Sequence, residues 1–249
     1  MSVVPEYIAR RIRRPIPNGS SVVPGSTPVV SFGNSRVATT ATLGINPSRV
    51  EFLDSSGNLL TDNRRLSTHE SLGVTSLADA SPGTISQVLD DCDNYFSLNP
   101  YRRWFDQLET ILNQSEASYY DGTACHLDLI QWATDPTWGG LDKSQKTTLL
   151  TADTQFLLDQ LTNESLSVLF VNGSAVIRQL RRSLDIEFAE QSPITGFARH
   201  DTRFFTGTIA GITVVGWSTN IQSSFGVSNE LRREIALRSS ELVASHAIA

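Results

Sequence analysis

The chain has 249 residues, of which 39% are hydrophobic and 18% charged, and its mean hydropathy is −0.15. This composition suits a folded globular protein and excludes a disordered or low-complexity chain. No apolar run approaches the ~20 residues that cross a bilayer, and the first residues lack the apolar segment of a secretory signal. We therefore expect no membrane contact, and the two cysteines, which fit no disulfide framework, favour a cytoplasmic location.

The charge of the chain gives two opposing indications. A net charge of −6 argues against nonspecific nucleic-acid binding, because contacts to phosphates supply most of that affinity. However, all but two of the 20 basic residues are arginine, and many are adjacent in the sequence, as in Arg181-Arg182. These pairs indicate either solvated helix faces with a bias toward arginine or guanidinium groups placed for phosphate.

The hydrophobic pattern predicts an N-terminal arm over residues 1–27 and a single α/β domain over 28–249. In chain order, we expect strands at 28–32 and 37–45, helices at 84–96 and 101–113, a strand at 126–132, a helix at 144–161, a strand at 166–171, a helix at 175–184, strands at 204–208 and 212–217, and a helix at 228–244. Residues 48–83 form an insertion with a hairpin-like turn at 55–57.

The alternation of strands and helices indicates the layering of the fold. The strands at 166–171 and 212–217 are apolar on successive residues, as expected when helices cover both faces of a sheet. The pattern therefore predicts a three-layer αβα sandwich with a central, mostly parallel sheet. The strands at 204–208 and 212–217 are separated by three residues, which favours a hairpin or an edge addition.

Polar turns that contain glycine or proline follow several of these strands. The first is Gly44-Ile45-Asn46-Pro47, and the others are ATDPTWGG, NGSAV and STNIQSSFG. Ligands of open parallel sheets bind at the carboxyl ends of the strands. Asn46 is therefore either the polar residue of an ordinary Asx-Pro turn or an amide that orients a water molecule for catalysis.

The order of these turns resembles that of the uracil-DNA glycosylase superfamily, and most closely its mismatch-specific thymine/uracil branch. LGINPS is similar to the first motif, in which the asparagine positions the hydrolytic water. VLFVNGSAV is similar to a scaffold strand and helix start, HLDLIQWATDP occupies the place of the strand that reads the flipped base, and VVGWSTNIQSSFG occupies the place of the second motif.

The resemblance implies a DNA glycosylase that hydrolyses the N-glycosidic bond of a modified or mispaired base without a metal or other cofactor. DNA is the implied partner, in repair or in defence against phage, and protein partners are unknown. Asn46 would be catalytic; Gly44, Ile45, Pro47, Trp132, Thr134 and Asp135 would line the base pocket; and Ser218, Thr219, Asn220, Gln222, Ser223 and Ser224 would contact DNA.

The motifs also differ from the family pattern. Ser48 replaces a glycine, and no proline or histidine follows the strand at 212–217. The insertion, together with the absence of the Tyr-His pair that follows the first motif in the family, favours a base different from or larger than uracil. Two alternatives stay open: a noncatalytic nucleic-acid or nucleotide-binding protein of the same fold, and a small-molecule nucleoside-type hydrolase. The acidic charge favours the latter. The two cysteines and four histidines show no metal-binding spacing.

Overall fold

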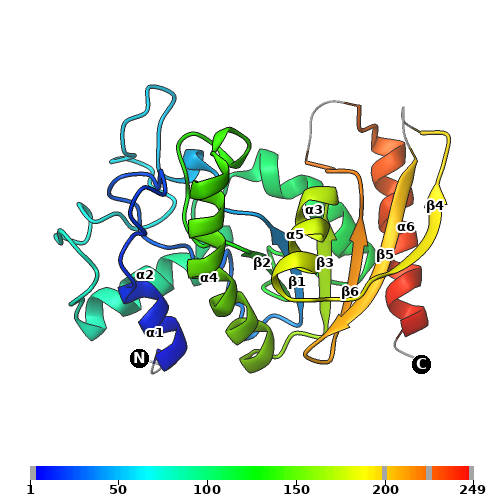
Figure 1. Ribbon diagram of the computed structural model, residues 1–249, viewed down its shortest axis with the longest axis horizontal. Coiled ribbons are helices and arrows are strands. Elements are labelled where there is room, and N and C mark those ends of the chain that lie inside the picture. Colours follow the sequence, from blue (N-terminus) through cyan, green and yellow to red (C-terminus); the bar gives the residue numbers. More distant parts are fainter. Residues whose placement is uncertain (1–3, 198–200, 223–225, 247–249) are drawn as a thin grey trace. The chain divides into compact units, whose positions relative to one another are not determined.

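The computed structural model describes residues 4–197, 201–222 and 226–246 (Figure 1). The chain forms two compact units, each built from separate segments. The first, called the helical unit, contains the chain up to Asn34, Ile45–Pro100 and Leu127–Gln160. The second, called the sheet unit, contains Ser35–Gly44, Tyr101–His126 and the chain from Leu161 onward. Each unit is described by itself below.

The described residues form six α-helices, three short 3-10 helices and six strands. In chain order these are α1 (Glu6–Arg13), β1 (Thr40–Gly44), η1 (Arg49–Glu51), α2 (Pro82–Asp93), η2 (Tyr95–Ser97), α3 (Arg102–Gln114), β2 (Ala124–Asp128), η3 (Trp138–Gly140), α4 (Lys143–Asn163), β3 (Val168–Asn172), α5 (Ser174–Ser183), β4 (Ala189–Ile194), β5 (Thr202–Ile209), β6 (Ile212–Trp217) and α6 (Asn229–His246).

The six strands form one mixed, mostly parallel sheet in the order β2-β1-β3-β6-β5-β4. β1 pairs in parallel with β3, and β3 in parallel with β6, whereas β5 is antiparallel to both β6 and β4. Figure 1 shows α5 on one face of the sheet and α3 with α6 on the other. The predicted α/β class with a mostly parallel sheet is confirmed, and the arrangement is compatible with a three-layer sandwich.

The elements with the strongest hydrophobic patterns agree best with their predicted positions. β6 spans the predicted residues 212–217, and the predicted pairing of the strands at 204–208 and 212–217 is confirmed as the antiparallel pair β5 and β6. α3 buries Phe105, Leu108, Ile111 and Leu112, which recur at helical spacing along one face. In the insertion, the predicted turn at 55–57 is confirmed by a bridge between Leu53 and Leu59.

Three elements differ from the prediction. The strand predicted at 28–32 is wrong, because this segment makes separate hydrogen bonds, such as Val29 N to Gln131 O at 2.7 Å, and joins no strand of the sheet. No helix was predicted near the start of the chain, but α1 forms within the segment expected to be an arm and buries Ile8 and Ile12. β4 was not predicted, because it is a polar, largely exposed edge strand that contains Pro193.

Candidate active site

Asn46 lies in the turn that follows β1 and enters the helical unit. Gly44 ends the strand and is half-buried, and the main-chain oxygen of Ile45 accepts a hydrogen bond of 3.0 Å from the nitrogen of Ile130. Pro47 is buried, and the hydroxyl of Ser48 caps η1 by accepting from the nitrogen of Val50. The turn is therefore held in place on both sides of Asn46.

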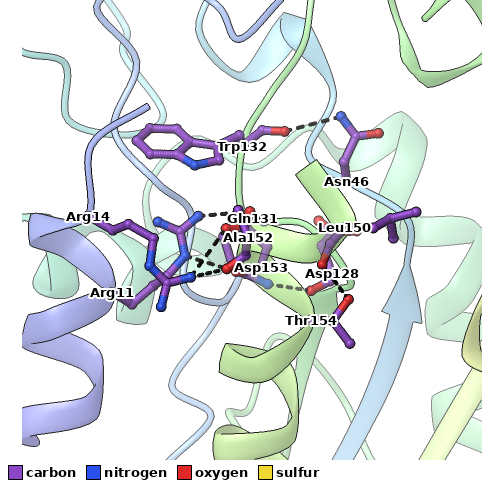
Figure 2. Close-up of polar contacts among 10 residues, drawn as sticks. All are labelled: Arg11, Arg14, Asn46, Asp128, Gln131, Trp132, Leu150, Ala152, Asp153 and Thr154. Carbon is purple, nitrogen blue, oxygen red and sulfur yellow. Dashed lines mark hydrogen bonds and ion pairs between the residues drawn. The ribbon is translucent and has the colours of Figure 1, made fainter. Parts of the chain in front are cut away.

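The side-chain amide of Asn46 is oriented by three oxygen atoms. Its nitrogen Nδ2 lies 3.2 Å from the main-chain oxygens of Pro47 and Trp132 and 3.2 Å from Oγ1 of Thr134. Carbonyl oxygens only accept hydrogen bonds, so the nitrogen end of the amide must face them. Figure 2 shows the bond to Trp132, with the amide oxygen Oδ1 of Asn46 pointing the other way.

The amide oxygen of Asn46 accepts no hydrogen bond from the residues that the structure describes, whereas the amide nitrogen is fully used. The side chain is half-buried, so this oxygen is not sealed in the core. Asn46 therefore does more than close its own turn: it joins the end of β1 to the segment at 132–134 and presents a fixed acceptor. An acceptor of this kind can orient a water molecule by accepting one of its hydrogen bonds.

Trp132 contributes its main-chain oxygen to this site, and Thr134 contributes its hydroxyl group. Both residues are 1% exposed. The Trp132 ring lies against Arg11, with the guanidinium carbon 4.9 Å from the ring centre, so only the main-chain oxygen of Trp132 reaches Asn46. Thr134 adds its hydroxyl to Asn46 and forms an isolated bridge with Val22. A contact between the Trp132 indole and a base in the predicted pocket would require the indole to leave this buried position.

Asp135 follows this segment at the surface. Its carboxylate lies 2.8 Å from the guanidinium of Arg49, and the two side chains are 39% and 38% exposed. The main-chain nitrogen of Asp135 donates to the oxygen of Ser21. This contact uses only Oδ1, so the second carboxylate oxygen of Asp135 can still accept a hydrogen bond, although Arg49 neutralises its charge.

A buried ionic cluster forms around Gln131, the residue before Trp132 (Figure 2). Arg11 donates to Oε1 of Gln131 and to Oδ2 of Asp153, each at 3.0 Å, and Oδ2 also accepts from the nitrogen of Gln131 at 3.0 Å. All three side chains are 0% exposed. Burial raises the pKa of Asp153, while the adjacent guanidinium of Arg11 opposes that rise. The cluster holds the main chain immediately before Trp132.

Glu51 is a buried carboxyl group that the sequence analysis did not select. It ends η1, is 2% exposed and accepts a hydrogen bond of 2.7 Å from the Tyr95 hydroxyl. The Nε atom of Arg65 lies 3.9 Å from the same carboxyl oxygen. Burial raises the pKa of Glu51 to about 7, and repulsion from Asp128 adds to the rise. The available signal was its apolar setting, Val50-Glu51-Phe52-Leu53.

The loop after β6 belongs to the sheet unit, and its polar side chains bond mainly to the protein itself. The Ser218 hydroxyl accepts from the nitrogen of Arg203 at 2.9 Å, and the Thr219 hydroxyl lies 2.7 Å from that of Thr202. Gln222 donates to the main-chain oxygen of Trp104 at 3.2 Å. These side chains are therefore committed to holding the loop. The predicted DNA contacts Ser223 and Ser224 lie outside the described residues.

Asn172, which was also not selected, organises this loop from the end of β3. Its side-chain oxygen accepts from Nε1 of Trp217 at 3.0 Å and from the nitrogen of Ile221 at 3.1 Å. Its side-chain nitrogen donates to Asn220 and Gln222, each at 2.9 Å. Both the oxygen and the nitrogen of the Asn172 side chain are thus engaged in hydrogen bonds within the protein. Asn172 therefore organises this loop and is not available to bind a ligand. The polar residue at the end of an apolar strand was the only sequence signal.

The sequence matches no protein-family model and no curated protein. Over residues 4–197, 201–222 and 226–246, no group of three or more histidine, cysteine, aspartate or glutamate side chains is placed to hold a metal ion. In the same described ranges, none of the helices has the length and apolar character needed to cross a membrane.

Proposed function

We propose that this protein is a monofunctional DNA glycosylase of the uracil-DNA glycosylase type, which acts in the cytoplasm on a flipped-out modified or mispaired base. The observation that carries the proposal is the orientation of Asn46, whose nitrogen is held by Trp132 and Thr134 while its oxygen is left to accept a hydrogen bond. The parallel arrangement of β1, β3 and β6 supports it, because the turn with Asn46 and the loop after β6 both follow carboxyl ends of parallel strands.

In the proposed reaction, Asn46 Oδ1 accepts a hydrogen bond from a water molecule and directs the water oxygen toward the anomeric carbon of the sugar. The bond between that carbon and the base nitrogen breaks, and the base leaves with the electron pair. The water oxygen forms the new bond to the sugar, and its proton passes through solvent to the departing base. An amide is not a base, so the enzyme gains its rate from orientation and electrostatics and is expected to be slow.

The extruded base would enter beside the backbone of Gly44, Ile45 and Pro47 and the 132–135 segment. Taking the nucleotide out of the stack costs a few kcal/mol, least for a damaged or mispaired base. Contacts between the protein and the DNA phosphates must offset this cost. The reaction leaves an abasic site, a product suited either to repair or to defence against phage DNA with altered bases.

The direct test is abasic-site formation. Oligonucleotides in single- and double-stranded form would carry uracil, a thymine mismatch, hypoxanthine, or hydroxymethylated or glucosylated cytosine, and alkali-labile sites would be measured. We expect cleavage of at least one substrate by the unaltered protein and a rate about 100-fold lower for Asn46→Ala, because the water loses its orienting acceptor. Thr134→Val keeps Oδ1 and removes only one partner of Nδ2, so its rate should fall less.

Asn18→Ala serves as the matched control, because this asparagine is exposed and has no bonding partner among the described residues. Its rate should equal that of the unaltered protein. Retention of full activity by a folded Asn46→Ala variant would exclude the proposed role of Asn46. If no substrate is cleaved and DNA binding shows no dependence on salt, the proposal fails.

A noncatalytic binding protein and a nucleoside hydrolase predict different results in the same assay. A binding protein would retain DNA without forming abasic sites. The acidic net charge of −6 favours a small substrate over a polyanion. A nucleoside hydrolase would therefore release bases from free nucleosides, with the same dependence on Asn46, and leave the oligonucleotides intact.

A further inference from the structure

A second concave site lies wholly within the sheet unit, between α5 and the strands β4 and β5. It is a pocket of about 330 Å³ lined by four arginines, Arg178, Arg181, Arg182 and Arg203, together with Glu190 and Phe205. The chain as a whole is acidic, yet four guanidinium groups face one carboxylate here. This local excess of positive charge needs an explanation.

The local structure brings the arginines together. Arg178, Arg181 and Arg182 are three and four residues apart on α5, so they share one face of the helix. The opposite face of α5 is buried through Val176 and Leu180. Arg203 comes from β5, two residues before Phe205, so these two side chains project from the same face of the strand. Helix packing thus turns the basic face of α5 toward the basic end of β5.

Aromatic rings hold part of this cluster in place. The guanidinium carbon of Arg181 lies 5.3 Å from the centre of the Phe188 ring and 5.0 Å from that of Phe205, and Arg203 lies 5.9 Å from the Phe205 ring. Phe205 itself is 5% exposed, so it supports the arginines and offers little surface to a ligand. These ring contacts restrict the conformations of Arg181 and Arg203, which reduces the entropy that binding costs.

The charge of the pocket is poorly balanced by the protein. Arg203 and Glu190 approach only to 4.0 Å, and both side chains are more than half exposed. The guanidinium groups of Arg178 and Arg182 have no hydrogen-bond or ion-pair partner in the part of the chain that the structure describes. They carry like charges at a spacing of four residues, an arrangement that destabilises a helix. A bound anion would remove this repulsion.

We propose that this pocket binds a phosphate group, either that of a small phosphorylated ligand or one from a nucleic-acid backbone. Guanidinium groups form paired hydrogen bonds to phosphate oxygens, and a phosphate monoester carries up to two negative charges against the excess of the pocket. A volume of about 330 Å³ is near the lower end of small-molecule sites, which suits one phosphorylated unit. The inference stands on these residues and does not depend on the glycosylase proposal.

Calorimetric titration tests the site with four probes: inorganic phosphate, pyrophosphate, thymidine monophosphate and an undamaged single-stranded oligonucleotide, with sodium chloride as the blank. The double variant Arg178→Gln/Arg182→Gln removes two exposed charges that have no described partner, so it should fold. We expect its affinity to fall about tenfold or more for every probe that the unaltered protein binds. Arg233→Gln, an exposed arginine on α6, is the matched control and should bind normally.

The probes separate the two sources of phosphate. Binding of phosphate, pyrophosphate or the mononucleotide that is lost in the double variant supports a small phosphorylated ligand. Binding of the oligonucleotide alone, lost in the double variant and weakened by salt, supports a nucleic-acid backbone. If no probe binds, or if the double variant and Arg233→Gln weaken binding equally, the pocket is not a phosphate site. Should the double variant misfold, Arg203→Gln on β5 provides the same comparison.

Discussion

At the scale of single residues, burial makes ionisation of the Glu51 carboxyl group unfavourable, and the neighbouring side chains offset this only partly. Its pKa rises from 4.5 to about 7 because burial penalises the ionised form more than Tyr95 and Arg65 stabilise it. In the unfolded chain the carboxyl ionises near 4.5, so between that pH and about 7 the folded state binds the extra proton. Stability from this group is therefore complete below pH 4.5 and falls as pH rises to about 7.

Glu51→Gln should remove this pH dependence. The amide is neutral throughout and keeps an oxygen that can accept from Tyr95. Urea unfolding should show a gain of up to about 3 kcal/mol at pH 8, from the size of the pKa change, and little gain at pH 4. Glu70→Gln, at an exposed position, should follow the unaltered protein at every pH. A variant that is less stable at pH 8 would show instead that the ionised form is the stabilising one.

The sequence could indicate some residues of the candidate site and not others. Asn46 and the 132–135 segment were selected because polar turns follow strands there, where ligands of parallel sheets bind, and the structure does bring Asn46 to Trp132 and Thr134. Glu51 and Asn172 were missed because their roles depend on partners distant in sequence: Tyr95 is 44 positions from Glu51, and Trp217 is 45 from Asn172. The hydrophobic periodicity of a sequence does not show contacts between residues so far apart.

At the scale of elements, Asn172 joins β3, β6 and the following loop through one amide. Replacing it with leucine keeps the volume but leaves the buried Nε1 of Trp217 and the nitrogen of Ile221 without their acceptor. We expect Asn172→Leu to lower the free energy of unfolding by about 3 kcal/mol in urea titrations. Asn229→Ala removes an exposed amide that contacts only Arg232 and should change it by less than about 0.5 kcal/mol. An unchanged Asn172→Leu variant would mean that the loop finds other acceptors.

The elements that could be predicted are those whose own hydrophobic pattern shows which of their faces are buried. β6 is apolar on both faces and α3 has a continuous apolar stripe, so their periods are unambiguous. α1 contains three arginines among eight residues, and Arg11 is buried only because Asp153 and Gln131 receive it. β4 is a strand only because β5 offers it a partner. Tertiary contacts, rather than local preference, decide these two elements.

At the scale of the whole molecule, the chain passes between the two compact units five times. Neither unit is a continuous segment, so the covalent connections oppose unfolding of one unit without the other. We expect one cooperative transition in urea, with coincident midpoints for far-UV circular dichroism and tryptophan fluorescence. Fluorescence reports on both units, since Trp132 and Trp138 lie in the helical unit and Trp104 and Trp217 in the sheet unit. Separate midpoints would show that the units unfold independently.

The buried Arg11 gives the beginning of the chain an unexpected part in the chemistry proposed for Asn46. Its guanidinium is the cationic partner of Asp153, which in turn fixes the nitrogen of Gln131, next to the carbonyl that aims Asn46. A shortened chain starting at Pro15 would remove the countercharge of Asp153 together with the buried apolar side chains of α1, and loss of one partner of a buried ion pair alone typically costs about 3–5 kcal/mol. Removal of the first fourteen residues, a routine step to improve crystallisation, would thus weaken the contacts that orient the side chain of Asn46, more than thirty positions downstream.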